Sequence, residues 1–128
     1  MDYYHSRLLT VSFAHAIERV GAALKNEGFG ILTDIDVSRT LKEKLGVTFR
    51  NYRILGACNP RLALEALELE DKVGTMLPCN VVVQQVDEAR IEVAAIDPVA
   101  SMAAIDNPRL KEAAQQVRTK LRRVIDSL

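Results

Sequence analysis

Residues 79–96 read CNVVVQQVDEARIEVAAI, two apolar runs joined by a short polar segment. The runs, residues 79–86 and 90–96, are rich in the β-branched residues that strands favour. Because only Asp87, Glu88 and Ala89 separate them, we predict a β-hairpin with antiparallel strands. This hairpin decides the fold class, since the segments before it alternate strand and helix as they would in a parallel α/β sheet.

Upstream of the hairpin, three strands and three helices are predicted from the spacing of apolar residues. The predicted strands cover residues 2–10, 30–37 and 52–58, and the predicted helices cover residues 13–27, 38–45 and 60–69. The alternation across residues 30–37 predicts one shared strand face, made of Ile31, Thr33, Ile35 and Val37.

The C-terminal helix has the clearest pattern. Asn107 is a favoured N-cap residue, and Pro108 is suited to the first helical position. Its apolar positions alternate spacings of four and three: Leu110, Ala114, Val117, Leu121, Val124 and Leu128. A coiled-coil seam has such a stripe, but over fewer than three heptads we favour a helix that lies on a sheet.

Together these elements give the order β-α-β-α-β-α-β-β-α in one domain, residues 1–128. We predict an α+β fold of two layers, with a mixed or mostly antiparallel sheet and long helices packed on one face. Of the 128 residues, 48% are hydrophobic, which suffices for one packed core.

Composition argues against several classes of partner. The 17 basic and 17 acidic residues balance, so we expect neither a nucleic-acid partner nor a membrane partner. A local basic cluster near the C-terminus also suits the negative end of a helix dipole, the interpretation that we favour. Its members are Arg118, Lys120, Arg122 and Arg123.

The cysteine content and the N-terminal segment bear on location. Neither a secretory signal nor a run of apolar residues long enough to span a bilayer is visible, so we expect a cytoplasmic protein. Two cysteines, Cys58 and Cys79, do not make a disulfide framework, and in the cytoplasm both are expected to be reduced.

Four short segments, in order, resemble the domain-of-unknown-function 302 family of small prokaryotic proteins over nearly the whole chain. They are EGFGI at 27–31 with Asp36, LGACNP at 55–60, LPCNV at 77–81 and IDP at 96–98. The resemblance implies a two-layer α+β fold of the TATA-binding-protein-like class and a homodimer. It implies no activity, because none is assigned to the family, and fold analogy to a DNA-binding protein does not transfer function.

A repeated Cys-Asn pair is the most unusual feature of the sequence. Cys58-Asn59 and Cys79-Asn80 each lie at a strand end beside a proline, so the four side chains could converge at one rim of the sheet. A helix N-terminus after Cys58 would favour a thiolate there, which suggests a thiol site for a metal or a reactive small molecule. We favour the alternative, in which both cysteines are buried as small apolar residues and Asn59 caps a helix.

Acidic and histidine residues give weaker signals. The side chains of Asp34 and Asp36 are predicted to project from the same face of a strand, where they could bind a hard cation. Asp36 is also placed to cap the next helix. His5 and His15 have no metal-like spacing and are interpreted as surface residues.

Three functions are compatible with these observations. We prefer a non-catalytic homodimeric module that binds or senses a small molecule, with Cys58, Asn59, Cys79, Asn80 and Asp36 as candidate ligand-binding residues. No cofactor and no metal are expected for it. The alternatives are a thiol-dependent enzyme or redox protein that uses Cys58 and Cys79, and an interaction module whose partner docks on the last helix or on a sheet edge.

Overall fold

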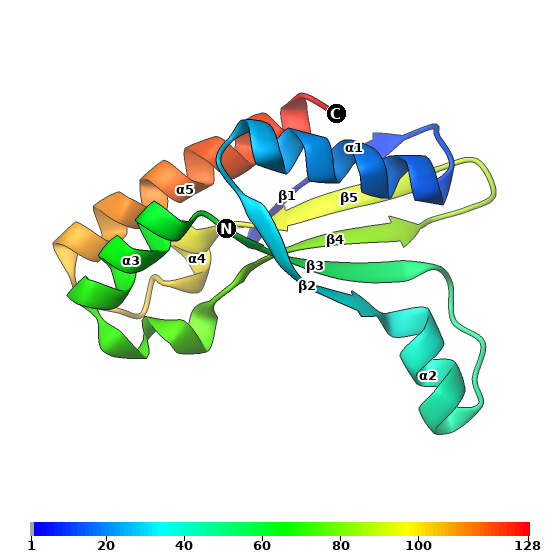
Figure 1. Cartoon of the computed structure of the whole chain (residues 1–128), viewed down its shortest axis with the longest axis horizontal. Helices are drawn as coiled ribbons and strands as arrows, with labels where there is room; N and C mark the ends of the chain where they lie inside the picture. The colour runs from blue at the N-terminus through cyan, green and yellow to red at the C-terminus, as the bar shows by residue number, and fades with distance from the viewer. Residues whose placement is uncertain (1) are drawn as a thin grey trace.

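The computed structural model describes residues 2–128 and contains five strands in one sheet (Figure 1). In space the strands run β1-β5-β4-β3-β2, and every neighbouring pair is antiparallel. Their bounds are β1 Tyr4–Leu9, β2 Gly30–Asp36, β3 Tyr52–Cys58, β4 Cys79–Gln85 and β5 Ile91–Ile96. The predicted hairpin is β4 and β5, so the α+β fold with a mostly antiparallel sheet is confirmed.

The helices begin where side-chain caps are available. Asn59 and Asn107 accept hydrogen bonds from backbone N–H groups at the starts of α3 and α5, and each is followed by a proline at the first helical position. The helices are α1 Phe13–Asn26, α2 Val37–Leu45, α3 Pro60–Leu69, α4 Pro98–Ser101 and α5 Pro108–Asp126, with a 3₁₀ helix, η1, at Asp71–Met76.

Helices α1 and α5 lie together against the sheet and bury one of its faces (Figure 1). Alternate residues of the strands point toward this layer, which gives the largest group of buried side chains. The central strands supply its middle: Leu55, Val81, Val83, Ile91 and Val93. Residues one position away point to the opposite face, which α1 and α5 leave uncovered and which we call the open face.

Strand β2, at one edge of the sheet, departs from the predicted alternation. A register shift between Ile31 and Thr33 places Ile31 opposite Ala57 of the helix-covered face and Thr33 opposite Gly56 of the open face. The expectation that Ile31, Thr33 and Ile35 share a face with Val37 is therefore wrong. A β-bulge adds one residue and reverses the faces, and Val37 already belongs to α2.

Helix α5 lies on the sheet as predicted, yet it serves two separate groups of buried residues. Its C-terminal half packs Leu121 and Val124 against the strands, whereas its N-terminal half packs Leu110 and Ala114 against α3, η1 and α4. Val117 and Leu121 lie in the middle of the apolar stripe, where both are expected to be buried; Leu121 is buried, but Val117 is only half-buried. Val117 faces a cavity instead.

Candidate functional site

The cavity lies where the two groups of buried residues separate, and its volume is about 300 Å³. Its floor is the adjoining ends of β3 and β4, and its walls are α3, α4 and α5. None of the lining residues that the structure describes is charged, and nearly all are apolar. Such a surface suits a neutral molecule, because a buried charge would find no partner there.

Small residues on two helices create this space. Ala63 and Ala66 of α3 line one wall, and Ala113 and Ala114 of α5 line another. Alanine at these positions leaves a gap that larger side chains would fill in an ordinary packed interior. Leu67 of α3 is partly exposed and also lines the cavity, which is open to solvent on one side.

The register of β3 and β4 brings the two cysteines to this cavity. Cys79 lies opposite Ala57, the residue before Cys58, and both cysteines line the cavity wall. Cys79 is buried and Cys58 is half-buried. Burial, and to a smaller extent the neighbouring Cys58, raises the pKa of the Cys79 thiol to about 11, so Cys79 is protonated at neutral pH.

Asn59 joins the cysteines at the cavity and has a structural task there. Its Oδ1 accepts the backbone N–H of Leu62 at 3.3 Å, which caps α3. Its amide also lies against Gly28, whose φ of +83° is a conformation that glycine adopts without strain. A Cβ on Gly28 would lie 3.0 Å from Asn59 Nδ2, so this glycine leaves room for the cap.

A second glycine, Gly56 on the open face, makes room for the segment that leads into Cys79. A Cβ on Gly56 would lie 2.1 Å from Thr33 Oγ1 and 2.6 Å from Pro78 Cγ, so that Thr33 and Pro78 would have to move. Glycine at this position therefore lets Pro78, which precedes Cys79, lie close over β3. Pro78 is itself a lining residue of the cavity.

The two other candidate ligand-binding residues lie elsewhere. Asn80 follows Cys79 on β4 and therefore points to the open face, where it lines a different hollow. Asp36 caps α2 by accepting the backbone N–H of Arg39 at 3.0 Å, and it does not line the cavity. The structure thus brings together Cys58, Asn59 and Cys79, and it separates Asn80 and Asp36 from them.

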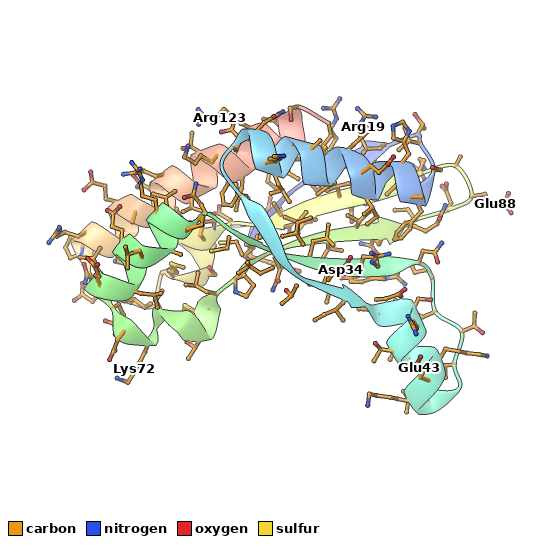
Figure 2. All side chains as sticks on the ribbon, in the orientation of Figure 1. Arg19, Asp34, Glu43, Lys72, Glu88 and Arg123 are labelled. Carbon is orange, nitrogen blue, oxygen red and sulfur yellow. The ribbon has the colours of Figure 1, made fainter. Side chains whose placement is uncertain are left out.

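The remaining acidic signals are also explained by local partners. Arg53 binds both carboxylate oxygens of Asp34, and this hydrogen bonding holds the pKa of Asp34 below its usual range. Figure 2 labels Asp34 on β2, apart from α3 and α5. No group of three or more histidine, cysteine or acidic side chains is arranged to hold a metal ion anywhere in residues 2–128.

The basic cluster of α5 is largely engaged in ion pairs. Arg118 Nε lies 3.2 Å from Oδ2 of the buried Asp97, without the angle of a hydrogen bond, and Arg122 lies 3.9 Å from the same oxygen. Arg123, which is labelled in Figure 2, donates to Glu27 at 3.0 Å. These contacts join α5 to the end of β5 and to α1 and favour a structural interpretation of the cluster.

Several residues of the cavity were not predicted as site residues, chiefly Met102, Leu110 and Val117. A usable signal was present in the sequence. Alanines occupy core positions on both α3 and α5, and two such stripes that face each other leave a space. Which helices face each other is set by the tertiary fold, so the signal could not be used without it.

The chemistry available at the cavity is narrow. It offers protonated thiol, amide and apolar surface, and it offers no carboxylate or imidazole that could act as a general acid or base. This arrangement is suited to noncovalent binding of an uncharged molecule. Over residues 2–128, every helix is too short or too polar to cross a lipid bilayer.

Comparisons with known proteins agree with this structure. Residues 5–128 match the profile of the domain of unknown function DUF302. A crystal structure described as an uncharacterised conserved protein DUF302 from Bacillus stearothermophilus superposes with a TM-score of 0.89 at 31% sequence identity, over 97% of this chain and 96% of that chain. No curated protein gives a significant match. The chain therefore belongs to the DUF302 family.

Proposed function

We propose that this chain is a non-catalytic homodimeric module that binds a neutral, apolar small molecule in the cavity between the sheet and helices α3 and α5. The observation that carries the proposal is the cavity itself, about 300 Å³ in volume and lined without charge. Cavities of this size and polarity are common ligand sites, because they bury most of the surface of a small molecule.

The polar groups at the cavity define the expected ligand further. The amide oxygen of Asn59 is already used by α3, so the rim offers few hydrogen-bonding atoms to a ligand. A ligand with a carboxylate or phosphate would lose its hydration without gaining a cationic partner. We therefore expect a compact aromatic or aliphatic molecule with at most one weak polar group.

A thiol-dependent reaction is disfavoured by the state of Cys79. The raised pKa keeps this thiol protonated, whereas nucleophilic and redox cysteines act as thiolates. No general base lines the cavity among the described residues to remove the proton. The two sulfurs are instead suited to contact an apolar ligand as polarisable surface.

The proposal is tested by the fluorescence of N-phenyl-1-naphthylamine, a neutral apolar dye whose emission rises on leaving water. We expect saturable binding by the wild-type chain. Ala63→Phe places a ring in the space beside α3 and should weaken binding at least tenfold. Ala22→Phe, on the exposed side of α1, is the matched control and should bind as the wild type does.

Two results would contradict the proposal. One is a wild-type chain that shows no saturable dye binding, and the other is an Ala63→Phe variant that binds the dye as tightly as Ala22→Phe. Far-ultraviolet circular dichroism of each variant shows whether it retains the native helix content. Titration of an anionic naphthalene sulfonate in parallel should give weaker binding than the neutral dye, because the lining has no cation.

A further inference from the structure

The open face of the sheet is unusually poor in charge for a surface in contact with water. It is formed by alternate residues of all five strands, identified by their register. Its middle row crosses the sheet from Ile35 through Ile54, Val82 and Ala94 to Ser6. Four of these five side chains are apolar, although 27% of the whole chain is charged.

One charged group, Glu92, lies on the open face of the strands that the structure describes, and it has a partner. Gln84, the cross-strand neighbour of Glu92, donates from Nε2 to Glu92 Oε1 at 2.9 Å. Gln84 in turn accepts a hydrogen bond from Arg50 at the border of the face. Covering this face would therefore bury one carboxylate per chain, and that carboxylate would keep its hydrogen bond from Gln84.

Tyrosines concentrate on the same surface. The chain has three, Tyr3, Tyr4 and Tyr52, and all three line a hollow of about 320 Å³ in the open face. Tyrosine is enriched at protein interfaces because its ring packs well while its hydroxyl tolerates water. The hollow is bounded below by Val82, Ala94 and Ile96 of the central strands.

We propose that a second copy of this chain docks on the open face, so that the two sheets pack face to face about a twofold axis. This inference rests on the proposed homodimer and assigns its surface. Two faces of this kind would pair with their apolar rows in contact and with their strands inclined by the sheet twist.

The size of the face fits this occupant. Five strands spaced by about 4.8 Å and about 20 Å long give a planar footprint of about 500 Å². Corrugation by side chains, together with Tyr3 and Arg50 at the border, increases the accessible area toward the roughly 800 Å² per partner of a standard interface. A twofold contact of this kind uses the same patch on both copies.

Charge favours a second copy over a nucleic acid or a strongly charged partner. No lysine or arginine points from the described strands to the open face, so phosphate groups would find no counter-charge on it. A charged protein partner would likewise have its charges buried without compensation. A low-charge face is best matched by another low-charge face, and an identical copy supplies one.

The test is the mass in solution, measured by light scattering on a size-exclusion column across a concentration series. The wild type should approach twice the chain mass of 14.2 kDa at micromolar concentration. Val82→Lys at the centre of the face, and Ile35→Lys where the side chain is already 49% exposed, should each raise the dimer dissociation constant at least tenfold. Ile35→Lys guards against misfolding of the central variant.

The matched control is Leu64→Lys, where the leucine is 59% exposed and lies on α3, a helix that packs against α5 and η1. It should leave the dissociation constant within twofold of the wild type. A wild-type dimer that both open-face variants leave intact would overturn the assigned surface while the homodimer stands. A wild-type chain that is monomeric at 100 µM would overturn both the homodimer and the surface assigned to it. Dye binding, measured on the same samples, would still test the cavity separately.

Discussion

The two faces of this sheet are built from the same strands and nearly the same residue types, yet they differ in what covers them. On the helix-covered face Val81, Val83 and Val93 are fully buried. On the open face Ile54 and Val82 are half-buried and Ile35 is exposed. Period-two alternation therefore identifies two faces of the sheet but does not tell which of them the helices cover. An apolar face that the helices leave uncovered indicates an interaction surface.

The largest expected effect is on the covered face. Leu121 of α5 is 1% exposed and packs against the strands, so Leu121→Ala should lower the free energy of unfolding by about 2–5 kcal/mol. Chemical denaturation at low protein concentration measures this. A loss below about 0.5 kcal/mol would mean that α5 contributes little to the core and would remove the contrast between the faces.

The next effect concerns Cys79, which also points to the covered face. Its pKa rises from an ordinary 9.0 to about 11, which reduces the thiolate fraction about a hundredfold at neutral pH. Native-state alkylation with peptide mapping should therefore label Cys79 much more slowly than free cysteine, and we expect slow labelling of Cys58 as well. Labelling of either faster than free cysteine would favour the thiol-site alternative.

The same thiol predicts a pH dependence of stability. Above pH 9 the unfolded chain loses the Cys79 proton while the folded chain keeps it until about pH 11, so this stabilisation is present below pH 9 and is lost as the pH rises through 11. The slope approaches about 1.4 kcal/mol per pH unit between these values. A wild type and a Cys79→Ala variant with parallel stability profiles from pH 8 to 11 would show that Cys79 does not titrate this way.

The smallest expected effect is on the open face of a single chain. Ile35→Ala, at a concentration where the chain is monomeric, should change the free energy of unfolding by less than about 0.5 kcal/mol. At concentrations where the dimer forms, the same substitution should cost more, because it removes contacts between copies. Equal costs at both concentrations would mean that Ile35 is outside the interface.

Much of the fold could be predicted from local chemistry. Asn59 and Asn107 cap their helices as expected, and the Asp87–Ala89 segment joins the hairpin. The bulge at Ile31–Thr33 could not be predicted, because it depends on pairing with β3. A local pattern does not reveal where one strand gains a residue against its partner.

The candidate site was predicted in part. The Cys-Asn repeats correctly identified Cys58, Asn59 and Cys79 as cavity residues. They did so because β3 and β4, which are consecutive strands in the chain, also pair with each other in the sheet. The repeat misplaced Asn80, since the residue after Cys79 must point to the other face. The helical walls of the cavity depend on how α3 and α5 pack, which no single segment encodes.

The most direct test of the central claim is a crystal structure of the wild-type chain grown with N-phenyl-1-naphthylamine. We predict density for the dye between Ala63 of α3 and Val117 of α5, in contact with Cys79. Density for the dye in the tyrosine-lined hollow of the open face, with the cavity lacking it, would contradict the account.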